Sequence, residues 1–331
     1  MTLLGLSLVT IALFVGFGLV VGVLFGFFGM GGSFLVTPAL LVLGYPATVA
    51  VGSGLAFVFG TSVVGALRHR THGQIDYTLA ASLTVSMTVG IEVGRRAVVV
   101  LDAFGSADLV IGVAYVVLLA LVGLFTLRDA RRESDARSSV DLADRVRAFA
   151  CPPMVTVAGG VRVSVWVILA LGGAVGTLSG LLGVGGGFLL LPAMLYGLGV
   201  PAGVAVGTDV LQITVSGAFG TFVYARLGAV SLPVVGSLLV GSAFGARIGA
   251  GASTLVEEDE LKEYFAAVLL AGSLAVALET LSTLFGVAAL NTASVVLVFG
   301  AATAVSAAIV RAAIGRVRAS ASRTPNALRA E

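Results

Sequence analysis

Two similar stretches of the chain, GFFGMGGSFLVTP at residues 26–38 and GLLGVGGGFLLLP at residues 180–192, decide the fold. A glycine inside a helix costs about 1 kcal/mol relative to alanine, so a glycine cluster within an apolar run predicts a helix break. The matched residues, at an offset of 154 positions (180 − 26), are Gly26, Gly29, Gly31, Gly32, Phe34, Leu35 and Pro38 with Gly180, Gly183, Gly185, Gly186, Phe188, Leu189 and Pro192. The chain therefore predicts the same break twice.

The match between the two halves continues beyond the glycine clusters. After one inserted residue the matched pairs are Pro46 and Pro201, Ala50 and Ala205, Gly52 and Gly207, Gly65 and Gly220, Gly73 and Gly228, Gly90 and Gly245, and Gly94 and Gly249. A run of matched glycines and prolines indicates an old duplication. Duplicated halves with discontinuous helices are typical of secondary transporters.

The composition predicts a membrane protein. Of 331 residues, 58% are hydrophobic and 11% are charged, with a mean hydropathy of +1.10, and no charged residue precedes Arg68. Soluble domains contain about a quarter charged residues. We expect an all-α polytopic membrane protein with two homologous repeats of about four to five transmembrane segments each. The apolar stretches are 5–28, 33–43, 47–67, 77–98, 106–127, 163–182, 187–198, 202–225, 231–252, 264–285 and 288–310.

Two of these stretches, 33–43 and 187–198, are too short to cross about 30 Å of hydrocarbon as straight helices. Both directly follow a glycine cluster, so we expect glycine-broken or re-entrant helices there. The first stretch lacks a basic segment and a cleavage signature, and is expected to be an uncleaved span.

Charge divides the chain into four predicted segments. They are a first transmembrane repeat at 1–127, a polar linker at 128–162, a second repeat plus a last span at 163–310, and a basic tail at 311–331. Arginine-rich loops stay in the cytoplasm, which places the linker and the tail there. An even number of crossings between them favours antiparallel repeats with the N-terminus outside, and parallel repeats with re-entrant short helices are the rival. Residues 140–149 predict either a surface amphipathic helix or a solvated linker.

The helix breaks predict an anion site. A helix that restarts after a glycine cluster presents free N–H groups and its positive dipole end, and glycine lets a ligand approach the backbone closely. For any single glycine, close packing between helices is the alternative. The predicted substrate-binding residues of the two clusters are Gly29, Gly31, Gly32, Ser33, Gly183, Gly185, Gly186 and Gly187.

The doubled motif G-x-x-G-x-G-G-[GS]-F-L-x-x-P followed by P…AVG[ST] resembles the sulfite exporter TauE/SafE family, also called the 4-toluene sulfonate uptake permease family. The resemblance covers about 19–103 and 169–285, and includes YARLGAVSL at 224–232 and GSAFGARIGA at 241–250. It implies membrane transport of sulfur-containing anions such as sulfite or sulfonates.

Neutral side chains within the spans are candidates for binding an anion. Ser53, Thr208 and Gln212 can hold sulfonate oxygens without a fixed charge, or they can hydrogen-bond between helices. Asp209 departs from the family pattern, because the first half has VGSGLAF where the second has VGTDVLQ. An intramembrane acid is costly and usually functional, so Asp209 is a candidate for coupling transport to H⁺ or Na⁺. Its alternative is an acid near a helix start.

The other intramembrane acids have local interpretations. Glu92 can pair with Arg95 and Arg96 along one helix, or with Arg247 at the matched position of the second repeat. Glu279 is a candidate proton relay, or a hydrogen-bond partner of Ser282 and Thr283. His69 and His72 lack further ligands that would complete a metal site.

The predicted function is a secondary transporter (permease) of small sulfur-containing organic or inorganic anions, ion-coupled and working by alternating access. We expect no catalytic residue, metal or cofactor, and a multi-pass location in the cell membrane. The expected partners are the anion, H⁺ or Na⁺ and the lipid bilayer, with a homo-oligomer possible and no nucleic acid. An intramembrane enzyme or a membrane scaffold without a ligand is the alternative.

Overall fold

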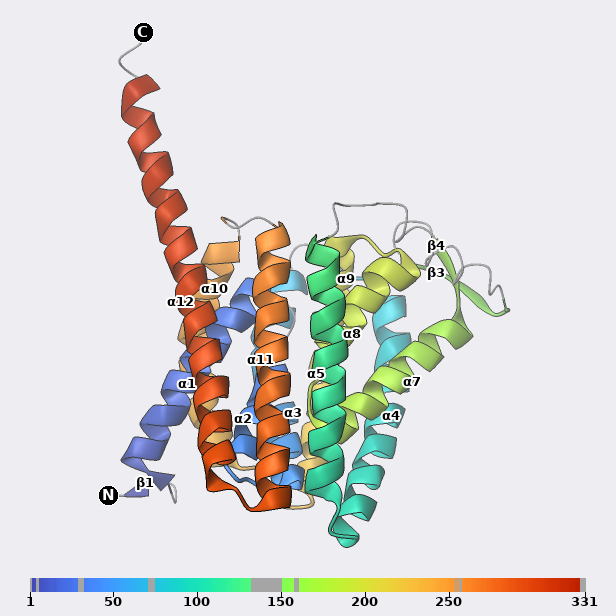
Figure 1. Ribbon diagram of the computed structural model, residues 1–331. Coiled ribbons are helices and arrows are strands. Elements are labelled where there is room, and N and C mark those ends of the chain that lie inside the picture. The colour runs from blue at the N-terminus through green and yellow to red at the C-terminus, as the bar shows by residue number, and fades with distance from the viewer. Residues whose placement is uncertain are drawn as a thin grey trace.

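The computed structural model describes residues 2–3, 6–28, 33–70, 75–131, 151–157, 161–253, 255 and 258–327 as a bundle of long helices (Figure 1). The first glycine cluster, at Gly29, Gly31 and Gly32, lies outside the described residues, as does the predicted amphipathic helix at 140–149. Ser33 begins a short 3-10 helix. The all-α fold class predicted from the sequence is confirmed.

Each half of the chain contains a short helical piece between longer helices. In the first half the elements are α1 (Leu8–Phe28), η1 (Ser33–Leu35), α2 (Val36–Val42), α3 (Ala47–Arg70), α4 (Tyr77–Ala103) and α5 (Ala107–Arg131). In the second half they are α7 (Val165–Leu182), α8 (Gly187–Pro192), the π-helical η2 (Ala193–Leu198), α9 (Ala202–Ala225), α10 (Leu232–Ser253), α11 (Glu258–Phe285) and α12 (Ala288–Ala327). The order of elements after the linker thus parallels the order before it.

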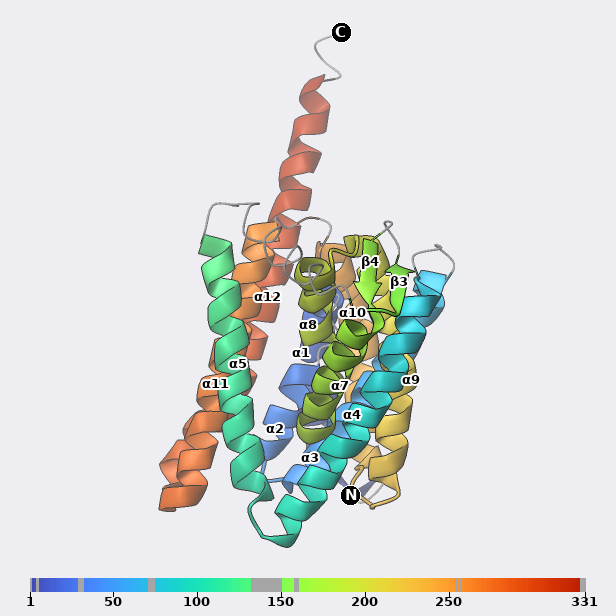
Figure 2. The ribbon, with the colours of Figure 1, turned by 90° about the vertical axis from the view of Figure 1, so that its right-hand side faces the viewer.

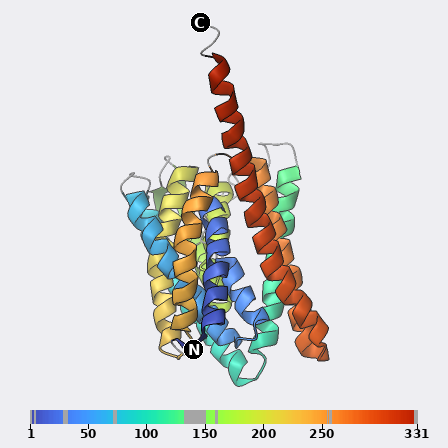
Figure 3. The same cartoon turned by 90° about the vertical axis from the view of Figure 1, so that its left-hand side faces the viewer.

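Helix length and composition are those of a membrane protein. Six stretches within the described residues are long and apolar enough to cross a bilayer: Leu8–Phe28, Ala107–Arg131, Val165–Leu182, Leu232–Ser253, Lys262–Phe285 and Ala288–Arg316. The expected basic tail is helical through Ala327, because α12 continues beyond the apolar stretch at 288–310. In Figures 1 and 3 this helix extends past the end of the bundle.

Short strands were not predicted from the sequence. Strand β3 (Met154–Val157) pairs antiparallel with β4 (Val161–Ser164) at the end of the expected polar linker, and β4 extends two residues beyond it. Valine occupies every second position of both strands (MVTV and VRVS), and β-branched residues at this spacing favour a strand. The Ser164 hydroxyl donates to the Cys151 carbonyl at 2.7 Å, which ties the hairpin to the start of α7. A second, minimal pair joins β1 (Thr2–Leu3) and β2 (Leu6–Ser7).

Glycines bring the backbones of α1 and α10 into contact. A Cβ on Gly22 would lie 2.6 Å from the Ser242 Cα atom, and one on Gly26 would lie 2.8 Å from the Ala246 Cα atom. Small residues permit such close approach between membrane helices. Because the residue numbers rise together along both helices, α1 and α10 run parallel.

Helices α7 and α4 repeat this interface at the positions that the duplication predicts. A Cβ on Gly176 would lie 2.7 Å from the Met87 Cα atom, and one on Gly180 would lie 2.7 Å from the Ile91 Cα atom. Adding 154 to Gly22 and Gly26 gives Gly176 and Gly180, and subtracting 155 from their α10 neighbours gives Met87 and Ile91. The two interfaces are therefore equivalent, and each joins one helix from each half.

The two halves run in opposite directions. In Figures 1 and 2, α1 starts at the end of the bundle opposite to the end of α5, the start of α7 and the end of α12. Helix α7 therefore descends where its counterpart α1 ascends. This arrangement agrees with the antiparallel scheme and disagrees with the parallel one.

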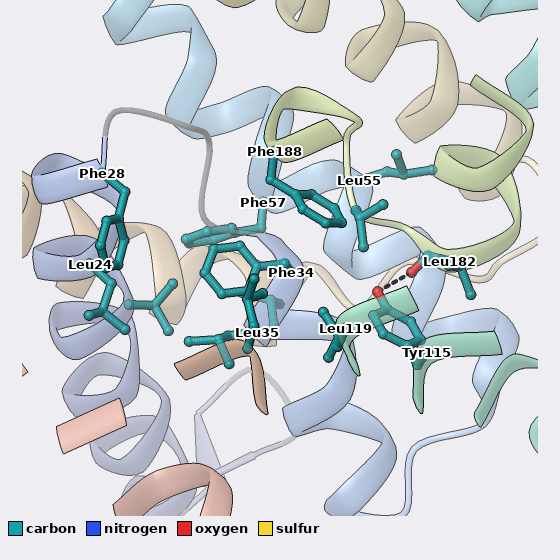
Figure 4. Close-up of a cluster of buried hydrophobic side chains, with 14 of the residues drawn as sticks. Leu24, Phe28, Phe34, Leu35, Leu55, Phe57, Tyr115, Leu119, Leu182 and Phe188 are labelled. Carbon is teal, nitrogen blue, oxygen red and sulfur yellow. Dashed lines mark hydrogen bonds between the residues drawn. The ribbon is translucent and has the colours of Figure 1, made fainter. Parts of the chain in front are cut away.

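Aromatic side chains fill the centre of the bundle. The rings of Phe34 and Phe188, which occupy matched positions of the two halves, lie 5.9 Å apart between centroids. Figure 4 shows these rings close to Phe57 of α3, and all three side chains are buried. The phenylalanine that follows each glycine cluster thus packs near the matched phenylalanine of the other half in the core.

Candidate functional site

The second glycine cluster breaks the helix as the sequence predicts. Helix α7 ends at Leu182 and α8 begins at Gly187. Gly183, Gly185 and Gly186 have φ angles of +75°, +69° and +82°. Side chains other than glycine adopt this left-handed conformation at a cost of about 1–2 kcal/mol per residue. We call residues 183–187 the second glycine segment.

This segment packs against helices of the first half. A Cβ on Gly183 would lie 2.5 Å from the Val51 carbonyl oxygen in α3, and one on Gly185 would lie 2.5 Å from a Val58 methyl group. A Cβ on Gly186 would lie 2.7 Å from the Met87 methyl group in α4. Each of these glycines thus serves close packing as well as its backbone conformation.

Gln212 of α9 lies next to this segment through Met87. Its side-chain Nε2 donates to the Met87 sulfur and, at 3.0 Å, to the Ser216 hydroxyl. Gln212 is fully buried, and its Oε1 atom has no hydrogen-bond partner among the described residues. Thioether sulfur is a weak acceptor, so this amide is poorly satisfied where it stands.

Asp209 lies one turn before Gln212 on the same helix. Its side chain is 2% exposed, and its Oδ1 atom has no partner among the residues that the structure describes. Helix α9 begins at Ala202, so Asp209 is beyond the first turn, and the alternative of an acid at the helix start is wrong. We call Asp209, Gln212 and Ser216 the α9 polar cluster.

Ser53 and Thr208 occupy matched positions and make matched hydrogen bonds. The Ser231 N–H donates to the Ser53 hydroxyl, and the Asp76 N–H donates to the Thr208 hydroxyl, both at 3.0 Å. Ser231 precedes α10, and Asp76 precedes α4. Both hydroxyls therefore hold the start of another helix. This is the hydrogen bonding between helices that the sequence analysis gave as the alternative to substrate binding.

Glu92 and Glu279 have separate local partners. Glu92 accepts from Arg95 at 2.6 Å and from Arg96 at 2.8 Å, which confirms the predicted ion pairs along the helix. Glu279 accepts from Asn291 at 2.7 Å and from the Ser294 hydroxyl at 3.2 Å in α12. The prediction of Ser282 and Thr283 as its partners is wrong, because those hydroxyls donate to nearby backbone carbonyls of the helix end.

Several buried groups were missed from the sequence. Ser179 in the last turn of α7 has a buried hydroxyl without a partner among the described residues. The Tyr224 hydroxyl donates to the Gly180 carbonyl at 2.5 Å, and the Tyr115 hydroxyl donates to the Leu182 carbonyl. Both tyrosines thus bind carbonyls at the end of α7, where helix carbonyls lack internal partners. The sequence indicated these two tyrosines only by placing a polar hydroxyl within an apolar span.

The chemistry available at this site is that of binding. The amide of Gln212, the hydroxyl of Ser179 and the backbone of the second glycine segment offer donors, and Asp209 is the ionisable group of the α9 polar cluster. Within the described ranges, no group of three or more His, Cys, Asp or Glu side chains could hold a metal ion.

The sequence is similar to those of known proteins. The model of the family "Sulfite exporter TauE/SafE" matches residues 14–278. A probable membrane transporter protein of Xylella fastidiosa (strain 9a5c) is 28% identical over 237 residues, which is 71% of this chain and 82% of that protein. The probable membrane transporter protein YjnA of Bacillus subtilis is 26% identical over 271 residues, 78% of this chain and 96% of YjnA.

A more distant organism has a similar protein. A probable membrane transporter protein of Methanocaldococcus jannaschii is 25% identical over 282 residues, 80% of this chain and 93% of that protein. No solved structure matches the chain. The family match extends from within α1 through most of α11. It therefore includes both glycine clusters of the sequence and both glycine interfaces. The chain belongs to the sulfite exporter TauE/SafE family of membrane transporters.

Proposed function

We propose that the chain is a secondary transporter that carries small sulfur-containing anions, such as sulfite or organic sulfonates, across the cell membrane. Transport is by alternating access around the second glycine segment and the α9 polar cluster. The linker and the C-terminal tail face the cytoplasm, which the arginines of both segments support.

One observation carries this proposal: the buried Gln212 amide donates to the weak acceptor Met87 sulfur, and Met87 lies against the helix break at Gly186. An unsatisfied buried polar group costs about 1–3 kcal/mol, and an idle amide is worse in a membrane than in water. An anion oxygen is a better acceptor for the Gln212 N–H than the Met87 sulfur that now receives it. A bound anion would accept from the Gln212 Nε2 atom, whereas the Gln212 Oε1 and Asp209 Oδ1 atoms, which have no partner among the described residues, are acceptors that a proton or a cation would satisfy.

Coupling to a cation follows from the charge of the cluster. The partners of Gln212 are a sulfur and a hydroxyl, both neutral, and Asp209 adds a carboxyl group. A carboxylate repels an anion strongly at low dielectric. An H⁺ or Na⁺ that accompanies the anion and binds at Asp209 removes this repulsion. We therefore assign coupling to Asp209 and anion binding to Gln212 and the glycine backbone.

Ligand-induced stabilisation of the purified protein tests the proposal. A ligand that binds only the native state raises the unfolding temperature by mass action. The panel is sulfite, sulfate, thiosulfate, sulfoacetate, taurine, toluene sulfonate, phosphate and chloride in detergent solution. We expect selective stabilisation by a sulfur anion, and loss of that stabilisation in Gln212→Leu.

A matched control separates the site from general salt effects. Ser237→Ala removes a hydroxyl of α10 that only bonds the Pro233 carbonyl of its own helix, and should leave stabilisation intact. Equal stabilisation by sulfate, phosphate and chloride, unchanged in Gln212→Leu, would overturn the sulfur-anion assignment.

A further inference from the structure

A cavity of about 400 Å³ lies between α5, α8 and α11 at the linker end of the bundle. Its lining includes Phe188, the residue that directly follows the second glycine segment, and also Asp129 and Lys262. Asp129 is two residues before the end of α5 at Arg131, and Lys262 is in the second turn of α11. The cavity therefore reaches from the linker face toward the second glycine segment, and its volume is that of ligand pockets.

The polar end of this cavity carries one ammonium group. The Lys262 Nζ atom lies 3.1 Å from an Asp129 carboxylate oxygen, and the two side chains are 21% and 42% exposed. Lys262 is also the only lysine among the 331 residues. A partly exposed ion pair of this kind contributes little to stability, so an incoming anion can compete with Asp129 for the lysine.

The rest of the lining is apolar. The lining has four aromatic rings, those of Phe28, Phe125, Phe188 and Phe265. Leucines of α5 and α8 line the wall between them. A bare dianion that entered such walls would lose hydration without new hydrogen bonds. An anion with an apolar group keeps its charge at Lys262 and places that group against the rings.

The matched position in the other half has a buried tyrosine. Leu182 is the counterpart of Phe28, and Phe34 is the counterpart of Phe188. There the fully buried Tyr115 side chain occupies the core and its hydroxyl donates to the Leu182 carbonyl (Figure 4). The Phe34 and Phe188 rings meet between the two sides. The cavity next to α8 lies at the linker end, and at the matched end of α7 the Leu182 carbonyl is bound by the buried Tyr115.

We propose that this cavity is the linker-side entry site for the transported anion, with Lys262 as the positioning residue that holds the anionic group. The apolar walls make the preferred substrate an organic anion rather than an inorganic one. This inference rests on the proposed function, since it assumes that an anion passes. The anion first binds Lys262 and displaces the Asp129 carboxylate. It then moves past Phe188 and reaches the second glycine segment.

A binding measurement that needs no transport tests the cavity. Reductive methylation of the full chain with ¹³C-formaldehyde keeps the charge of Lys262 and labels its amine and the N-terminal amine. We expect the Lys262 resonance to shift saturably with benzenesulfonate, at concentrations at least tenfold lower than with sulfite. The N-terminal resonance and the neutral analogue benzenesulfonamide are the controls. A Lys262 resonance that moves no more than the N-terminal one would overturn the proposal.

Transport kinetics test the positioning role. With benzenesulfonate on the linker side, Lys262→Gln should raise KM about tenfold and leave kcat within twofold, and Lys262→Arg should restore KM. Asp129→Asn should lower KM, because the competing carboxylate is gone. Arg311→Gln, which removes an exposed cation of α12, should leave KM unchanged.

The outcomes separate this inference from the proposed function. Flux in the wild type with an unchanged KM in Lys262→Gln overturns the entry site and leaves the transporter standing. If the wild type carries no sulfur anion, the proposed function fails first, and the Lys262 resonance still decides whether the cavity binds an organic anion.

Discussion

The equivalence of the two glycine interfaces predicts a specific cost for filling them. In Gly176→Ala the new Cβ would lie 2.7 Å from the Met87 Cα atom, whereas ordinary contacts begin at 3.4 Å. The nearest atom, the Met87 carbonyl oxygen, would lie at 2.5 Å, so helices α4 and α7 must separate locally by about 0.9 Å (3.4 − 2.5), and the opposing atoms are backbone, which cannot rotate away. Overpacking of this kind costs about 1–3 kcal/mol.

Gly173→Ala is the matched control for this substitution. It lies one turn earlier in α7, and a Cβ there meets nothing within 4 Å. Both substitutions gain the same helix propensity, about 1 kcal/mol at most, so the difference between them isolates the interface. The same comparison in α1 is Gly22→Ala against Gly16→Ala, where Gly16 is also open.

Thermal unfolding in detergent, followed by size-exclusion chromatography after heating, measures the difference. At about 2–4 °C for each kcal/mol in a chain of this order of size, Gly176→Ala should melt about 2–12 °C below Gly173→Ala. Gly22→Ala should fall below Gly16→Ala by a similar amount. Equal melting temperatures within either pair would refute the close backbone packing, and an effect in only one pair would refute the equivalence of the interfaces.

Four further substitutions probe the site. Gly186→Ala should lower the free energy of unfolding by about 1–2 kcal/mol because of its positive φ, and should abolish flux. Adding Met87→Ala should relieve the contact with the new Cβ but not the backbone strain. Melting temperature and uptake measure the two effects. Asp209→Asn should retain anion binding but lose dependence of uptake on an H⁺ or Na⁺ gradient, and uptake that still follows the gradient would remove its coupling role. Tyr115→Phe should lower the free energy of unfolding by about 1–3 kcal/mol because the buried Leu182 carbonyl loses its donor, and an unchanged melting temperature would contradict that.

Helix positions could be predicted from the sequence because hydrophobic length and the glycine–proline pattern set them. Apolar runs such as 187–198 and 202–225 coincide with α8–η2 and α9. The direction of the repeats also followed, from arginine placement. The strands β3 and β4 were missed since their alternation is short and lies within a polar segment.

The site was predictable only where a residue type is rare in a span. Gln212 and Asp209 stand out in an apolar helix, and both are buried with an oxygen that has no partner within the described part of the chain. Ser53 and Thr208 looked alike as ligand donors, but their matched bonds to helix starts depend on contacts 178 and 132 residues away along the chain. Sequence spacing cannot show such contacts, and the same holds for Met87 beside Gly186.

Solute uptake into proteoliposomes tests the central claim most directly. The purified chain is reconstituted with an internal sulfur anion, and exchange with the same labelled anion outside is followed in the wild type, Gln212→Leu and the control Ser237→Ala. The account predicts saturable exchange in the wild type and the control, and loss of exchange in Gln212→Leu despite normal folding and reconstitution. Exchange that is equally fast in Gln212→Leu would contradict the site, and no exchange of any sulfur anion by the wild type would contradict the assigned substrate class.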